Sequence, residues 1–74
     1  MAVRKVDFTL REGETFIPLI ALLKAVNAVE SGSMAQQVVT DGLVRRNGEM
    51  ELRKRAKIVA GDVIRFQNVE IVVS

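Results

Sequence analysis

Positive charge in this chain is concentrated in one short segment. Residues 45–57 carry six basic and two acidic residues, a net charge of +4, whereas residues 1–44 and 58–74 each carry a net charge of −1. The basic side chains of the segment are Arg45, Arg46, Arg53, Lys54, Arg55 and Lys57. A local excess of this kind is typical of a surface that binds phosphate groups, although solubility alone could account for some of it.

The last part of the segment is predicted to be an extended strand, from Met50 to Lys57. Alternate side chains of a strand point to opposite faces, so Arg53, Arg55 and Lys57 would share one face and Lys54 would lie on the other. A solvated strand edge can also be basic, since lysine there discourages edge-to-edge pairing. Six basic residues in thirteen exceed what that needs, so we favour phosphate binding.

Two arginines precede a predicted hairpin turn at Asn47–Gly48, a pair favoured where both central residues need positive φ. Arg45 and Arg46 would point to opposite faces, so one can bind a phosphate while the other bridges Glu49 or Glu51 across the hairpin. The two glutamates could also form a carboxylate pair. Nothing nearby suggests a metal or a nucleophile, so pairing with the arginines is the preferred interpretation.

A second candidate phosphate site is the predicted helix start at residues 31–33, Ser-Gly-Ser. We expect Ser33 to accept the N–H of residue 36 while Gln36 bonds back to the backbone of Ser33. The unpaired N–H groups and partial positive charge of a helix start could hold a phosphate beside Ser31. Capping alone explains both serines equally well.

The remaining periodicity predicts the elements that position these residues. A first helix begins at Pro18, a favoured residue type in a first turn, and carries Lys24 on its flank; its apolar face is Leu19, Leu22, Leu23 and Val26. A second helix ends at Gly42 and buries Ala35, Val38 and Val39. Alternating apolar residues predict strands at 5–10, from 43 to the hairpin turn, at 63–66 and at 69–73. These elements predict one α+β domain over residues 1–74.

Several functional classes are excluded by composition. Cysteine and histidine are absent, which removes disulfides, cysteine-based metal sites and the usual general base at neutral pH. We therefore expect no enzyme, no metal, no cofactor and no small-molecule substrate. The longest apolar run is far shorter than the ~20 residues of a membrane span, and no signal peptide is recognisable, so a cytoplasmic protein without a membrane partner is expected.

Aromatic residues are also scarce. The chain has three phenylalanines and neither tyrosine nor tryptophan, so base stacking is a poor explanation for nucleic-acid binding. The phenylalanines and two of the methionines are instead expected in the core or at its edge: Phe8, Phe16, Phe66, Met34 and Met50.

The order of several motifs resembles a known family. These are L-x-x-L-L-K at 19–24, S-G-S-x-A-Q at 31–36, Gly42, V-x-x-N-G-E at 44–49, R-K-R-x-K at 53–57 and A-G-D-V-I-x-F at 60–66. They are similar to the alpha-L RNA-binding domain of the ribosomal-protein S-four type, and closest to its small stand-alone bacterial, YbcJ-like members. The resemblance covers residues 17–66. It implies two short packed helices beside a small, bent, mostly antiparallel sheet.

The resemblance also implies a partner and a contact surface. The partner would be structured RNA in the cytoplasm, ribosomal RNA included, and the contacts would come from Lys24, Ser31, Ser33, Arg45, Asn47, Arg53, Lys54, Arg55 and Lys57. Gln36 and Gln37 stand where many members carry a basic residue, and Arg46 stands at a position that is usually apolar. These three are kept as candidate contacts, although the glutamines could weaken the helix contribution and shift binding towards the hairpin.

The expected function is therefore recognition of structured RNA through phosphate and shape contacts, in ribosome assembly or as an adaptor on the ribosome. The alternative is a protein-interaction module that has no need of RNA. In that case the final segment, residues 69–74, would form an exposed sheet edge and pair with a strand of a partner protein.

Overall fold

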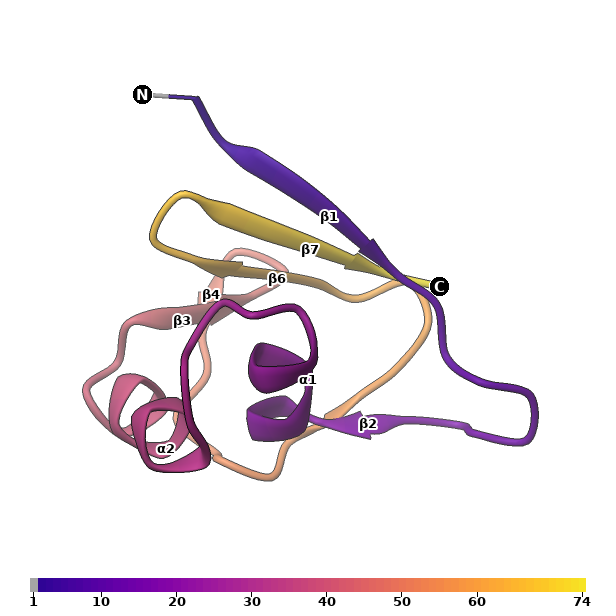
Figure 1. Cartoon of the computed structure of the whole chain (residues 1–74), viewed down its shortest axis with the longest axis horizontal. Coiled ribbons are helices and arrows are strands. Elements are labelled where there is room, and N and C mark those ends of the chain that lie inside the picture. The colour runs from indigo at the N-terminus through magenta and orange to yellow at the C-terminus, as the bar shows by residue number, and fades with distance from the viewer. Residues whose placement is uncertain (1) are drawn as a thin grey trace.

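The computed structural model describes residues 2–74, in which two helices cover one face of a five-stranded sheet (Figure 1). The sheet order is β1-β7-β6-β3-β4, and only β1 and β7 run parallel. The strands are β1 (Arg4–Phe8), β7 (Val69–Val73), β6 (Val63–Phe66), β3 (Val44–Arg46) and β4 (Glu49–Met50). A separate antiparallel pair joins β2 (Ile17–Pro18) to β5 (Lys57–Ile58). The predicted α+β fold with a mostly antiparallel sheet is confirmed.

Both helices follow the predicted apolar periodicity. Helix α1 (Leu19–Ala25) buries its three leucines, and Pro18 is its N-cap rather than its first helical residue. Asn27, with φ of 57°, then turns the chain away. Helix α2 (Gly32–Thr40) buries Ala35, Val38 and Val39, and Gly42 adopts a φ of 75° just beyond its end. Positive φ strains residues that have a Cβ, so glycine is favoured at this helix end.

The start of α2 differs from the predicted cap. Ser31 is the N-cap, and its Oγ accepts the backbone N–H of Met34 at 3.2 Å. The prediction that Ser33 caps the helix with Gln36 was wrong. Serine is a favoured cap at either position, but the helix begins two residues earlier than predicted, at Gly32 rather than Met34.

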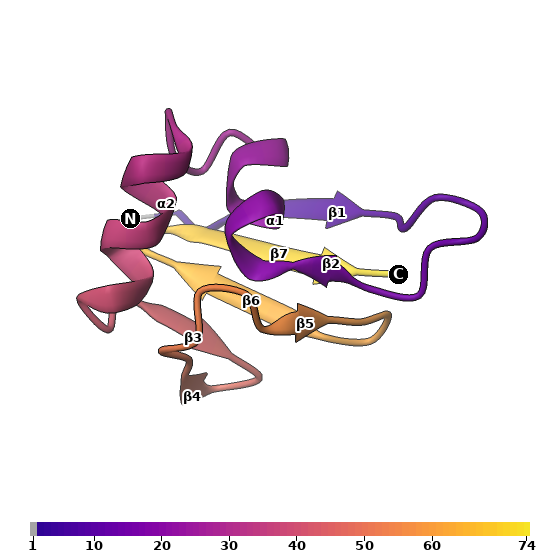
Figure 2. The ribbon, with the colours of Figure 1, turned by 90° about the horizontal axis from the view of Figure 1, so that it is seen from below.

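The core lies between the helices and one face of the large sheet (Figure 1), and Figure 2 looks from the side of the helices, with α1 drawn in front of β7. Alternate strand residues point to that face, so it is built from Val44, Ile64, Phe66, Ile71 and Val73, each at most 2% exposed. The intervening residues of the same strands, among them Arg45, Arg65 and Glu70, belong to the opposite face and are more exposed.

Three further expectations were wrong. The chain from Met50 to Lys57 is not one strand, because β4 ends at Met50 and the next strand begins only at Lys57. Met34 and Met50 are not core residues, since 41% and 53% of their surface is exposed, and Phe16 is 37% exposed. Phe66 is buried as expected. The final strand β7 is no edge, because it lies between β1 and β6.

Within residues 2–74, neither helix has the length and apolar character that a membrane span requires.

Candidate nucleic-acid interface

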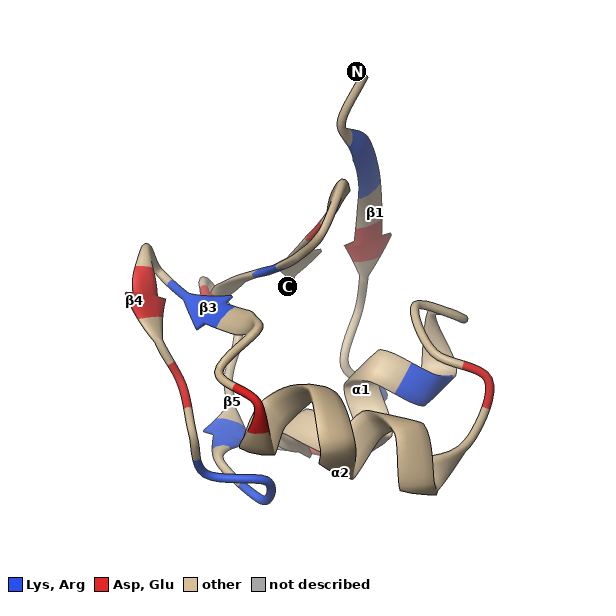
Figure 3. Cartoon of the chain, turned by 90° about the vertical axis from the view of Figure 1, so that its left-hand side faces the viewer, with Lys and Arg blue, Asp and Glu red and all other residues tan. Residues whose placement is uncertain are grey.

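Four of the predicted contact residues lie in residues 53–57, which we term the basic loop: Arg53, Lys54, Arg55 and Lys57. All four are exposed, and Figure 3 shows their positive charge gathered between β4 and β5. A turn closed by the N–H of Ala56 on the carbonyl of Arg53, at 3.2 Å, shapes the loop. The alternation expected of a strand therefore does not apply to these side chains.

The start of α1 holds the backbone of the basic loop. Leu19 N–H donates to the carbonyl of Ala56 at 3.0 Å, and Ile20 N–H donates to the carbonyl of Lys54 at 3.2 Å. The first N–H groups of a helix lack partners within the helix, so these two bonds satisfy donors that would otherwise need water or a ligand. The loop carbonyls are thereby turned towards the protein.

Arg46 fixes the other side of the loop from within the protein. Its Nη2 lies 2.8 Å from Asp62 Oδ2 and 2.9 Å from the carbonyl of Lys57, and its Nη1 lies 3.6 Å from Glu51 Oε1. Only 23% of the Arg46 side chain is exposed. The predicted bridge from one arginine to Glu51 is confirmed, and Asp62 is the stronger partner. This arginine holds the fold together rather than facing outwards.

The side chain of Asn47, like that of Arg46, is hydrogen-bonded within the protein. Its amide Nδ2 donates to Asp62 Oδ1 at 3.0 Å, and its Oδ1 accepts the backbone N–H of Val63 at 2.9 Å. With φ of 53°, Asn47 also provides the positive φ that the turn requires. Both hydrogen-bonding ends of this predicted contact residue therefore join the hairpin to β6.

Two buried carboxylates complete this network. Burial by itself would raise the pKa of Asp62, but hydrogen bonds from the Val59 N–H, Asn47 and Arg46 outweigh it and leave the pKa below its usual value. The pKa of Glu51 is also lowered, chiefly by its side-chain bond to Arg53 and despite burial. Both groups are therefore held as anions that anchor arginines.

Arg53 serves two purposes at once. Its backbone N–H and its guanidinium both bond to the Glu51 carboxylate, with donor–acceptor distances of 3.1 to 3.2 Å. Yet 73% of its side chain is exposed. Arg53 can therefore face a phosphate, but part of its charge is already offset by Glu51.

The other side chains of the loop are differently placed. Lys57 Nζ lies 5.1 Å from the centroid of the Phe16 ring, a cation–π arrangement that leaves the ammonium at the surface. Within residues 2–74, no ion pair is formed by Lys54, Arg55 or Lys57. These three carry most of the uncompensated charge of the loop.

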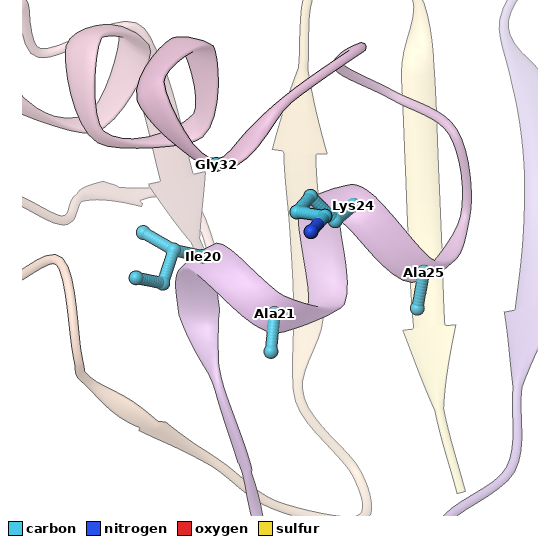
Figure 4. A pocket seen from close by; sticks show the side chains of 5 residues that line it. All are labelled: Ile20, Ala21, Lys24, Ala25 and Gly32. Atoms are coloured by element: carbon cyan, nitrogen blue, oxygen red, sulfur yellow. The ribbon is translucent and has the colours of Figure 1, made fainter.

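Lys24 extends the basic surface along α1. It lies four residues after Ile20, whose N–H holds the loop, and thus on the same side of the helix about 6 Å further along. An open groove of about 500 Å³ runs beside it, lined by Ile20, Ala21, Lys24, Ala25 and Gly32 (Figure 4). The groove joins the loop end of α1 to the start of α2. The predicted sites at Lys24 and at residues 31–33 are therefore brought together.

Helix α2 itself carries no charged residue, and its ribbon in Figure 3 is tan throughout. Gln36 and Gln37 are exposed, and Gln37 Nε2 donates to Asp41 Oδ1 at 2.9 Å. Ser33 is exposed and Ser31 is used as the cap. Positive charge is thus placed on either side of α2 and not on it.

Arg65 was not among the contact residues predicted from the sequence. Arg65 on β6 lies directly opposite Arg45 on β3, and both are exposed on the outer face of the sheet. Like charges opposite each other destabilise a strand pair, but Glu70 of β7 lies directly opposite Arg65 on its other side and offsets part of this charge. Arg45 lies between Arg65 and Met50, so its charge is less compensated, and the pair is a further candidate phosphate contact. The sequence does show that Arg65 alternates with the apolar residues Ile64 and Phe66, which predicts an exposed side chain. That it lies beside Arg45 follows only from the pairing of β3 with β6.

The family model of the S4 domain matches residues 8–74, nearly the whole chain. The chain belongs to the S4 domain family. This confirms the resemblance suggested by the motifs, and it extends the matched region beyond residues 17–66 to the last strand.

Named relatives of this S4 domain include two bacterial proteins. The Escherichia coli (strain K12) protein, named "Putative RNA-binding protein YbcJ", is 42% identical over 50 residues, which are 68% of this chain and 71% of the relative. The Shigella flexneri protein, named "Uncharacterized protein YbcJ", gives the same values. The solution structure of the Escherichia coli protein aligns with a TM-score of 0.66 and 36% identity, covering 90% of this chain and 86% of that one. That structure is described as revealing an alpha-L motif involved in RNA binding.

Proposed function

We propose that this S4 domain binds structured RNA, and that the basic loop is its principal contact. The proposed unit is the whole chain, residues 1–74, with residues 17–66 as the core motif. The relative from Escherichia coli is named for RNA binding and its structure is described in the same terms, which supports RNA as the partner.

The observation that carries the proposal is the anchoring of the loop. Its carbonyls at Lys54, Ala56 and Lys57 are held by α1 and Arg46, while its basic side chains remain exposed. A loop that is already ordered loses less conformational freedom on binding, so its cations can meet a phosphate backbone at lower entropic cost. Lysine and arginine in such positions contribute affinity that does not depend on sequence.

The contact surface is divided by role. We assign phosphate contacts to the exposed basic residues Lys24, Arg45, Lys54, Arg55, Lys57 and Arg65, with a smaller part for Arg53. Arg46 and Asn47 position the loop and the hairpin and are left out of the direct contacts. Ser33, Gln36 and Gln37 are exposed neutral residues of α2, and we assign them hydrogen bonds to RNA sugars or phosphates. Binding at the start of α2 would also use its unpaired backbone N–H groups.

Recognition is proposed to rest on shape and phosphates rather than on bases. The one aromatic ring beside the loop, Phe16, already lies under Lys57, so no stacking platform is offered there. We place the activity in binding and not in catalysis, in the cytoplasm, with ribosomal RNA among the candidate targets and ribosome assembly among the candidate processes.

The proposal is tested by comparing affinities for a hairpin RNA, a DNA duplex of equal length and a single-stranded RNA. The wild type is expected to prefer the hairpin RNA. A K54E/R55E variant is expected to lose at least about tenfold in affinity for it while keeping its circular dichroism spectrum. Equal affinity for all three nucleic acids, or unchanged binding by the folded variant, would contradict the proposal.

The alternative of a protein-interaction module needs a different edge from the one expected. Residues 69–74 are enclosed in the sheet, and within residues 2–74 the outer strands are β1 and β4. β4 has only two residues, so β1 is the longer candidate for strand pairing.

A further inference from the structure

The outer edge of β1 is open among residues 2–74, since β1 stands first in the sheet order (Figure 1). The backbone N–H groups of Arg4 and Leu10 point inwards to β7 and the chain after it, bonding to the carbonyls of Asn68 at 2.7 Å and Ser74 at 2.8 Å. Backbone groups alternate in direction along a strand. The groups directed to the open edge therefore belong to Lys5, Asp7 and Thr9.

We propose that β1 pairs antiparallel with β1 of a second copy of this chain, joining two sheets about a two-fold axis. Such an interface is self-complementary, because the same strand serves both sides. The inference is independent of RNA binding, since β1 lies at the far end of the sheet order from the β3–β4 hairpin that leads into the basic loop.

The charges of the strand select one register. Bonding requires that residues with outward backbone groups oppose each other. If at least three of the five residues of β1 are to pair, the axis lies at Lys5, Val6 or Asp7. With the axis at Lys5 or Asp7, like charges meet, and directly opposed like charges are destabilising. With the axis at Val6, Lys5 of each copy opposes Asp7 of the other. Lysine alone discourages edge pairing, but its alternation with aspartate makes this edge complementary to itself.

The other face of β1 favours the same register. Val6 and Phe8 pack against the core but are only partly buried. With the axis at Val6, the two copies of Val6 meet, and Phe8 opposes Arg4 of the second copy. The pairing would therefore cover partly exposed apolar surface and bring a guanidinium beside a phenyl ring.

Sedimentation equilibrium without RNA tests the proposal. The apparent mass is expected to rise with concentration from the 8.2 kDa of one chain towards twice that value. D7K, and separately K5D, should raise the dissociation constant by about tenfold or more. The K5D/D7K double variant should associate again. An equimolar mixture of the two single variants should form heterodimers, because opposite charges then face each other.

The two single variants also show whether a loss of association is caused by a loss of folding. Lys5 Nζ lies 3.9 Å from Glu70 Oε2 in its own sheet, so K5D is expected to lower thermal stability, whereas Asp7 lies opposite Val72 and D7K does not have this cost. Amide hydrogen exchange of the wild type needs no variant. The N–H groups of Lys5, Asp7 and Thr9 should gain protection as concentration rises.

Three results would overturn the proposal. One is a constant mass of 8.2 kDa up to about 1 mM, where even millimolar association populates dimers. Another is association that both single variants leave unchanged. The third is exchange at the outward amides that does not depend on concentration.

Discussion

Arg45 and Arg46 are identical neighbours on β3 that lie on opposite faces of the sheet. Arg46 reaches Asp62, Glu51 and the carbonyl of Lys57, and Arg45 is exposed. Guanidinium suits the internal position because its planar fork can bond several acceptors at once, which lysine cannot do. The same chemistry therefore serves structure at one residue and an external anion at the next.

Removal of these two guanidiniums should separate stability from binding. R46Q is expected to lower the free energy of unfolding by about 2 kcal/mol, because two buried carboxylates lose a charged partner. R45Q, the matched control, should change it by less than about 0.5 kcal/mol and should weaken RNA binding instead. Urea unfolding and RNA titration of both variants measure this. Equal destabilisation by the two substitutions would contradict the assignment.

At the scale of elements, local signals predicted most of the fold. Apolar periodicity placed both helices and strands β1, β3, β6 and β7, and the Asn-Gly pair placed the hairpin turn, because these features depend on neighbours in sequence. Residues 50–57 were predicted as one strand, but residues 51–56 lie in no strand and include most of the basic loop. Their backbone is held by Leu19, Ile20 and Arg46, which are distant in sequence. The alternation of residue types within the segment gives no information about such partners.

For the candidate site, the sequence indicated the segment but not the role of each residue in it. The concentration of basic residues indicated a segment whose basic side chains are exposed, and Lys24 does approach the start of α2. The sequence could not separate the exposed Arg45 from Arg46, nor show that Asn47 is bonded at both ends, because Asp62 lies fifteen or more residues away. Arg65 was missed for the same reason, since its neighbour Arg45 is set by the β3–β6 register.

The buried carboxylates give the junction of hairpin, loop and β6 a defined response to pH. Asp62 and Glu51 have lowered pKa values in the folded state, so the unfolded state takes up protons first as the pH falls. Their contribution to stability is therefore complete above the unfolded pKa values of about 4 and is lost as the pH falls through the folded ones.

The corresponding prediction concerns the acid limb of the stability curve. D62N should be less stable than the wild type at neutral pH, and its free energy of unfolding should fall less steeply below about pH 4, because one linked group is gone. Urea unfolding at several pH values provides the measurement, with E12Q as an exposed control of equal charge change. A wild-type acid slope retained in D62N would disprove the linkage.

For the whole molecule, the distribution of charge matters more than its sum. The net charge is only +2, yet the basic loop and Lys24 place cations on either side of an uncharged α2 (Figure 3), and the Arg45–Arg65 pair adds two on the outer face of the sheet. Each cation that neutralises a phosphate releases counterions, so the number of contacts can be read from the salt dependence of binding.

The most direct test is the slope of log affinity against log salt for a hairpin RNA. For K54Q/R55Q the slope should be shallower than that of the wild type by about 1.5, since each lost phosphate contact removes roughly 0.7 to 0.9. R4Q/R11Q removes the same charge from β1 and the turn after it, far from the loop in Figure 1, and should change the slope by less than about 0.5. An equal change in both variants, or none in K54Q/R55Q, would contradict the loop as the RNA contact.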